Sequence, residues 1–248
     1  MIAQLRSELR KMRTTRTNLG LFLGMIGLIL LTILVGGLTS DRFDLSEVDS
    51  QKELFGNGTV ASVFVALIGI MAMTSEFRHG TIRATFVFTP VRNRVVAAKV
   101  LASLLMGIAF GAFGQALAFG AGYAVIRGKG VEFALGAGDV RLIVLGTIGM
   151  SALWAAIGVG VGAVVRNQVF AILGLSVWAF LVENVLTNFL PGVARYAPGS
   201  ASSAMTGDTT GLGSMHLLTP AAGVLLLTAY AAAFTLAGAV VTNRRDVG

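Results

Sequence analysis

Residues 19–38 read LGLFLGMIGLILLTILVGGL and contain no charged side chain. A helix needs about 20 apolar residues to cross the hydrocarbon core of a bilayer, so this stretch is long enough. Comparable segments follow at 57–78, 91–126, 140–165, 168–190 and 219–241. The second of these has a short apolar centre, 60–74, which spans only about 22 Å at 1.5 Å per residue and must recruit flanking residues. The sequence therefore predicts an all-α integral membrane protein with six transmembrane helices.

The composition agrees with this fold class. Of the 248 residues, 55% are hydrophobic and 12% are charged, whereas a soluble domain carries about 25% charge. Long apolar blocks argue against an outer-membrane barrel, whose strands alternate. The absence of cysteine excludes disulfide scaffolds and thiol-based metal or redox sites. We expect one transmembrane domain over 1–248, with an N-terminal amphipathic helix at 1–17, a six-span bundle at 19–241 and a tail at 242–248.

Lysine and arginine gather in alternate connections between the spans. The N-terminal segment, the second and fourth connections and the tail are basic, whereas the first connection begins with an acidic stretch at 41–53. Positively charged loops stay in the cytoplasm, so both termini are expected there. Arg127 and Lys129 in the third connection weaken this asymmetry without reversing it.

The same distribution gives an expected location. Because the net charge of +7 lies between and beside apolar blocks, it indicates membrane orientation rather than nucleic-acid binding. Arginine is favoured over lysine, and alanine, glycine and valine are abundant, a bias typical of GC-rich bacteria. We therefore expect a multi-pass protein of the bacterial cytoplasmic membrane.

The first residues have helical periodicity. Apolar side chains recur at spacings of three and four, and a second face is basic. The apolar set is Ile2, Leu5, Leu9 and Met12, and the basic set is Arg6, Arg10 and Arg13. Such a helix can lie on the cytoplasmic leaflet, with its basic side chains near anionic lipid headgroups, and touch a partner. The alternative is an orientation signal that happens to be helical.

The stretch 75–99, SEFRHGTIRATFVFTPVRNRVVAAK, interrupts the apolar pattern between the second and third spans. Gly80 lies where a left-handed C-cap would end the second span. Residues 81–88 can form a short helix, and Thr89 and Pro90 suit the N-cap and first position of the next helix. A short exposed helix with apolar and arginine faces suits docking in a groove of a partner. The alternative is an ordinary basic cytoplasmic loop.

The segments 76–83 (EFRHGTIR) and 89–94 (TPVRNR), followed by Lys99, resemble the membrane subunit of type-2 ABC exporters. In that family an acidic residue, Gly-Thr, a Pro-x-Arg segment and a lysine lie between the second and third spans. The resemblance extends over the chain, through the basic amphipathic start, six spans, a polar segment before the last span and an Arg-Arg-Asp tail at 244–246.

The resemblance implies a function beyond what composition indicates. The loop between spans two and three would be a cytoplasmic coupling helix docking on a separate ATP-binding subunit, and the N-terminal helix would lie beside it. Two membrane subunits, identical or different, and two ATPase subunits would form one exporter for a drug, antibiotic or lipid-like amphiphile, with the architecture of ABCA and ABCG exporters. ATP and Mg would be bound by the partner, with no cofactor in this chain. The coupling residues would be Glu76, Arg78, His79, Gly80, Thr81, Arg83, Pro90, Arg92 and Arg94.

The fifth span carries a second polar group. Glu183 lies in an apolar run with Asn184 and Asn188 beside it, and Pro191-Gly192 indicates that the helix ends or bends there. A carboxylate at the centre of a span costs about 2.5–3.5 kcal/mol. Glu183, Asn184 and Asn188 are therefore candidates for a substrate pathway or gate, the alternative being a structural hydrogen bond near the outer leaflet. The resemblance implies re-entrant helices after this span.

Several functions lack the residues that they need. The chain has no phosphate-binding loop and no hydrolase or metalloprotease motif, so it is not expected to be an enzyme, and no catalytic residue is assigned. His79 and His216 are expected on opposite sides of the membrane, so no metal site is predicted. An ion-coupled secondary transporter, or a scaffold or sensor component, stays open as an alternative. Three glycine pairs spaced by four, 20/24, 107/111 and 158/162, are expected to pack helices inside one subunit.

Overall fold

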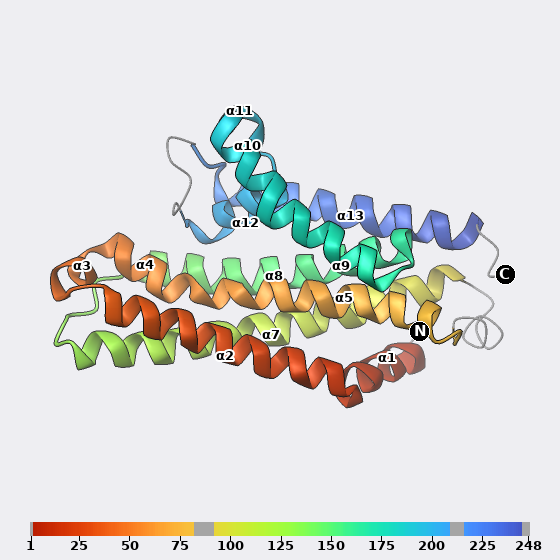
Figure 1. Cartoon of the computed structure of the whole chain (residues 1–248), viewed down its shortest axis with the longest axis horizontal. Helices are drawn as coiled ribbons and strands as arrows, with labels where there is room; N and C mark the ends of the chain where they lie inside the picture. The colour runs from red at the N-terminus through yellow and green to blue at the C-terminus, as the bar shows by residue number, and fades with distance from the viewer. Residues whose placement is uncertain (1, 82–91, 209–215, 245–248) are drawn as a thin grey trace.

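The computed structural model describes residues 2–81, 92–208 and 216–244, and these residues form helices joined by short connections, with no strand among them (Figure 1). In chain order the helices are α1 (Ile2–Thr14), α2 (Arg16–Thr39), α3 (Arg42–Ser46), α4 (Val48–Gly56), η1 (Asn57–Thr59), α5 (Val60–Arg78), α7 (Arg92–Gly128), α8 (Ala137–Val165), α9 (Gln168–Val177), η2 (Trp178–Val182), α10 (Glu183–Phe189), α11 (Pro191–Ala194), α12 (Pro198–Thr206) and α13 (Pro220–Arg244).

Six helical segments within the described ranges are long and apolar enough to cross a membrane, which confirms the predicted number of spans. They are Arg16–Thr39, Val48–Arg78, Asn93–Gly128, Ala137–Val165, Gln168–Phe189 and Pro220–Arg244. The predicted boundaries agree with these to within a few residues at most ends. The second span recruits residues on its N-terminal side, because α4, η1 and α5 follow one another without a break.

Close backbone contacts hold the centre of the bundle together. A Cβ atom on Gly158 of α8 would lie 2.2 Å from the Ala66 carbonyl oxygen of α5, so only glycine permits this approach. A Cβ on Gly107 of α7 would lie 2.6 Å from Ala152 Cα of α8. Gly162 and Gly111 repeat these contacts one turn away, which confirms that the pairs 107/111 and 158/162 pack helices within the chain. In the third predicted pair, 20/24, a Cβ on Gly20 would meet nothing within 4 Å.

The remaining helices surround this centre. Helix α2 packs on α7 and α5, and α13 packs on the far side of α8 (Figure 1). The apolar core between α2, α4, α5 and α7 includes Met25, Ile29, Phe55 and Val65. Helix α1 and the C-terminal end of α13 lie at one end of the long axis, whereas the α7–α8 connection lies at the other (Figure 1). Helix α1 therefore lies beside the C-terminal end of α5 and the start of α7.

The fifth span differs from the others in shape and packing. The segment α9–η2–α10 tilts away from the bundle (Figure 1) and exposes large apolar side chains, including Phe170, Phe180 and Phe189. Residues Trp178–Val182 form a π-helical turn, which was not predicted, because this apolar stretch contains neither proline nor glycine. The predicted end at Pro191-Gly192 is confirmed, since α10 ends at Phe189 and Pro191 begins α11. Helix α12 then packs against α8 and α13.

Candidate functional site

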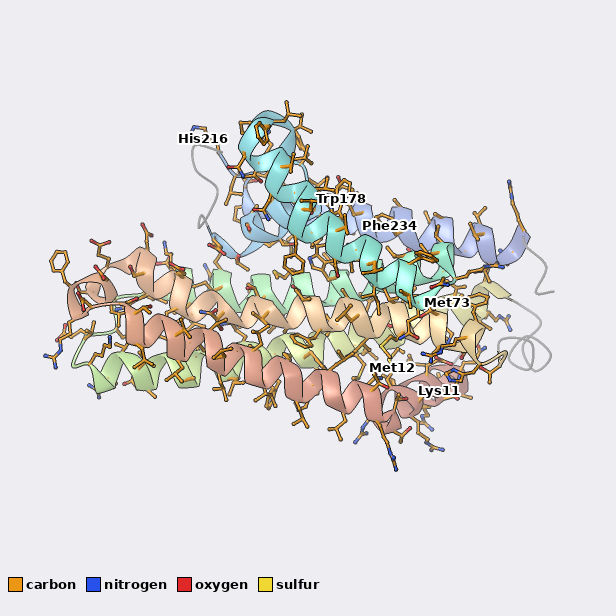
Figure 2. All side chains as sticks on the ribbon, in the orientation of Figure 1. Lys11, Met12, Met73, Trp178, His216 and Phe234 are labelled. Carbon is orange, nitrogen blue, oxygen red and sulfur yellow. The ribbon has the colours of Figure 1, made fainter. Side chains whose placement is uncertain are left out.

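Four charged side chains from three helices meet at the end of the bundle that holds helix α1. Lys99 of α7 is 1% exposed, and Glu76 of α5 and Glu8 of α1 are also buried. Lys11, one turn after Glu8, covers them from the outside with half of its side chain exposed. Figure 2 shows Lys11 and the neighbouring Met12 at this end of the molecule (Figure 2). We call Glu8, Lys11, Glu76 and Lys99 the ion cluster.

The ammonium group of Lys99 uses all three of its hydrogens. It donates to Glu8 Oε2 at 2.8 Å, to Glu76 Oε1 at 2.8 Å and to the Ala72 carbonyl oxygen at 3.0 Å. Lys11 Nζ donates to Glu8 Oε1 at 2.7 Å and to Glu76 Oε1 at 2.9 Å. Two carboxylates thus share two ammonium groups, and the formal charges of the cluster sum to zero. Glu76 Oε2 is buried and has no hydrogen-bond partner in the described part of the chain.

Burial makes the charges of the cluster depend on one another. Removing an ion from water costs several kcal/mol, and mutual attraction offsets this only where the geometry is good. Lys99 meets that condition, because each of its donors has an acceptor. The cluster therefore fixes α1 against α5 and α7. Hydrophobic packing alone would hold so short a helix only loosely.

Lys11 has a raised pKa for an identifiable reason. Partial burial lowers the pKa of its ammonium group, but the hydrogen bonds and negative charges of Glu8 and Glu76 outweigh burial and leave the pKa above the usual range for lysine. Lys11 therefore stays protonated throughout the physiological range.

A cavity of about 510 Å³ adjoins the ion cluster. Its polar lining includes Asn18, Ser75 and His79, and Thr81 lies at its edge, immediately before 82–91. Asn18 Nδ2 donates to the Met12 carbonyl oxygen at 2.9 Å, which ties α2 to the end of α1. The cavity thus lies between the N-terminal helix and the chain segment that leads out of α5.

Of the predicted coupling residues at the end of α5, Glu76 is buried in the ion cluster, whereas Arg78, His79 and Gly80 are exposed. Gly80 has a φ of +67°, which confirms the left-handed cap, and His79 Nδ1 lies 2.8 Å from the Ser75 carbonyl oxygen. Arg78 reaches the start of α9, where its Nη1 lies 3.5 Å from Gln168 Oε1. Thr81 is also exposed.

The other predicted coupling residues lie within or after 82–91, the segment between α5 and α7 that is outside the described residues. Arg94 is exposed in the first turn of α7, and Arg92 is the first residue of that helix. Arg83, Pro90 and nearly all of the expected short helix at 81–88 lie outside the described residues.

The N-terminal helix has the predicted basic face and an unpredicted buried carboxylate. Arg6, Arg10 and Arg13 are exposed, and Met12 is buried. Glu8 lies on the buried side, where it holds Lys99. A sequence signal exists, because Glu8 falls three residues after Leu5 and four before Met12, on the face that was assigned as apolar.

Glu183 and the two asparagines that follow it make different contacts. Its Oε1 accepts hydrogen bonds from Trp178 Nε1 at 2.8 Å and from the Gly199 backbone nitrogen at 3.1 Å. Asn184 and Asn188 are exposed and donate to carbonyl oxygens one turn earlier in their own helix. Glu183 thus joins the fifth span to the first turn of α12, whereas the asparagines face outward.

A metal ion is held by a group of ligating side chains. Among residues 2–81, 92–208 and 216–244, no three His, Asp or Glu side chains lie close enough together to hold a metal ion. His216 lies near the end of the long axis opposite Lys11 (Figure 2), whereas His79 lines the cavity beside Lys11.

Comparison with known proteins provides no family assignment. The sequence matches no described protein family, and it matches no curated protein.

Proposed function

We propose that this chain is the transmembrane subunit of an ATP-binding cassette exporter, working with a separate ATPase subunit and a second permease copy. The observation that carries the proposal is the ion cluster. It joins the N-terminal helix, the end of the second span and the start of the third into one block, at the point where the chain enters 82–91. A force applied at that loop would reach three helices together.

The proposed mechanism follows from this arrangement. ATP binding would bring two ATPase subunits together, and the loop around 76–94 would act as the coupling helix that moves with them. The bundle would then rearrange between two states, with the nucleotide biasing the balance. The exposed charges of Arg78 and Arg94 at the same end would contact the partner. This scheme places both termini in the cytoplasm of a bacterial cell and α12 as a re-entrant helix on the other side.

Charge reversal of exposed residues tests the proposed docking. Arg78→Glu and Arg83→Glu together leave the ion cluster intact, so the spans are expected to fold normally while co-purification of the ATPase subunit falls sharply. Arg127→Glu makes a matched change at the opposite end of α7 and should retain the partner. Unchanged co-purification in the double variant would contradict the docking role.

A second candidate is an ion-coupled secondary transporter. The observation that favours it is the presence of carboxylates within or beside the spans, of which Glu8 and Glu76 are buried and Glu183 is partly buried, since ionisable groups in membranes often bind the coupling ion. Such a transporter would move solute in liposomes under an ion gradient without ATP or a partner, whereas the exporter would not. A scaffold or sensor component would move no solute under either condition.

A further inference from the structure

Arg141 is a charged residue in the fourth span that has no partner among the described residues. It lies one turn after the start of α8, at the end of the bundle opposite α1 (Figure 1). Its side chain is exposed, and the described parts of the chain provide it with no hydrogen bond or ion pair. The nearby carboxylate of Asp139 is already paired with Lys52 of α4, at 3.1 Å. No described side chain therefore competes with an external anion for the guanidinium.

Two apolar grooves meet at Arg141. The larger, of about 630 Å³, lies between α8 and α13 and is lined by Gly149, Leu153 and Val224 among others. The smaller, of about 550 Å³, is lined by Phe133, Leu135 and Val144 among others. Both grooves are lined by Arg141 and Leu145, and Leu145 is 62% exposed. Leu145 therefore separates the two grooves, and Arg141 lies one turn before it on α8, where the grooves meet.

The larger groove has the length of a lipid chain. Its lining residues on α8 run from Gly138 to Leu153, a distance of about 22 Å at 1.5 Å per residue. One leaflet of hydrocarbon is about 15 Å deep, half of the bilayer core. From Arg141 to Leu153 the groove runs about 18 Å at 1.5 Å per residue, slightly more than the depth of one leaflet. Within a bilayer its apolar walls favour acyl chain over water.

We propose that Arg141 and these two grooves bind one anionic diacyl phospholipid of the leaflet at that end of the bundle. The lipid phosphate accepts hydrogen bonds from the guanidinium, whose planar fork suits two phosphate oxygens. One acyl chain lies on each side of Leu145. Charge complementarity and the paired grooves select this occupant, because the phosphate of a zwitterionic lipid is already balanced by the cation of its own headgroup, whereas that of an anionic lipid is not. The proposal requires only that α8 spans a membrane and does not rest on the exporter function.

Native mass spectrometry of the full chain in detergent tests the site, with phosphatidylglycerol and phosphatidylcholine of equal chain length as probes. We expect one tightly retained phosphatidylglycerol per chain, favoured over phosphatidylcholine by about fivefold, the factor for one basic side chain at a membrane surface. Lysophosphatidylglycerol, with one chain, is expected to bind more weakly. Glycerol phosphate, with none, should not compete. Equal retention of the one-chain and two-chain lipids would overturn the paired-groove arrangement.

Two variants and their controls locate the site. Arg141→Gln should abolish the preference for phosphatidylglycerol, whereas Arg127→Gln removes the same charge from the same end of the molecule and should retain it. Ala221→Trp fills the larger groove from α13 and should reduce retention of both lipids, whereas Ala229→Trp on the same helix lies outside both grooves. An unchanged preference in Arg141→Gln, or equal losses in Arg127→Gln, would refute the site. Capture of a second protein in place of lipid would also refute it.

Discussion

Two glutamates in the spans are held in different ways. Glu76 lies in the ion cluster and receives two ammonium groups, from Lys99 and Lys11. Within the described ranges, Glu183 accepts only neutral N–H donors, from Trp178 and Gly199. The first arrangement depends on charge balance among three helices, whereas the second depends on the close approach of one backbone. The difference indicates that charge pairs join three helices at the cluster end, whereas a single carboxylate with neutral partners joins the fifth span to α12.

The largest expected effect comes from breaking the charge balance. Lys99→Met leaves the buried carboxylates of Glu8 and Glu76 with only Lys11, and removing one partner of a buried pair destabilises by about 3–5 kcal/mol. Unfolding in mixed detergent micelles measures this loss. Adding Glu76→Gln to Lys99→Met restores a neutral cluster and should recover part of the lost stability. A double variant no more stable than Lys99→Met would show that charge balance is not what the cluster provides.

The next effect concerns the contact between Glu183 and α12. A Cβ on Gly199 would lie 1.9 Å from Glu183 Oε2, so Gly199→Ala must displace the carboxylate. The end of this side chain can move, so the cost is that of its lost hydrogen bonds, about 1.5–3 kcal/mol for a charged acceptor. Thermal unfolding should show the loss, and the fluorescence of Trp178 should shift as its hydrogen bond breaks. Gly192→Ala is the control, because nothing lies within 4 Å of a Cβ there. Equal stability of the two variants would contradict the described contact.

The comparison is sharpened by removing one charge at each site. Hydrogen bonds to charged groups contribute about 1.5–3 kcal/mol and neutral ones about 0.5–1.5 kcal/mol. Glu183→Gln keeps an acceptor for Trp178 and Gly199, so its loss is expected to stay near 1 kcal/mol. Glu76→Gln leaves two ammonium groups facing one carboxylate and should lose more. The melting temperatures of the two variants are compared, and Glu76→Gln is expected to have the lower one. A lower melting temperature for Glu183→Gln would contradict the distinction between the sites.

The smallest effect concerns pH. The pKa of Lys11 is raised in the folded chain, so its contribution to stability is fully present at neutral pH and is lost as pH rises through that raised pKa. Lys11 is half exposed, and solvent screening limits its contribution to under about 1 kcal/mol. The stability difference between the wild type and Lys11→Met should therefore narrow in alkaline solution. A difference that widens instead would contradict the pairing.

The six spans could be predicted because each depends on its own residues. A helix in lipid satisfies its backbone internally, so a long apolar run is sufficient to identify it. The glycine cap at Gly80 could also be predicted from local sequence. The ion cluster could not, because Lys99 meets Glu8 across 91 positions and Glu76 across 23. The contact between Glu183 and Gly199 was equally hidden, since it requires knowing that α12 folds back beside α10.

Labelling of introduced cysteines tests the central claim most directly, because the chain has no cysteine of its own. Arg78→Cys places a thiol at the exposed end of α5, and Arg127→Cys places one at the opposite end of the bundle. The account predicts that a membrane-impermeant maleimide labels Arg78→Cys only in inverted vesicles, and more slowly once the ATPase subunit is bound, with Arg127→Cys labelled only in intact cells. Labelling of Arg78→Cys in intact cells, or at a rate that the ATPase subunit leaves unchanged, would contradict it.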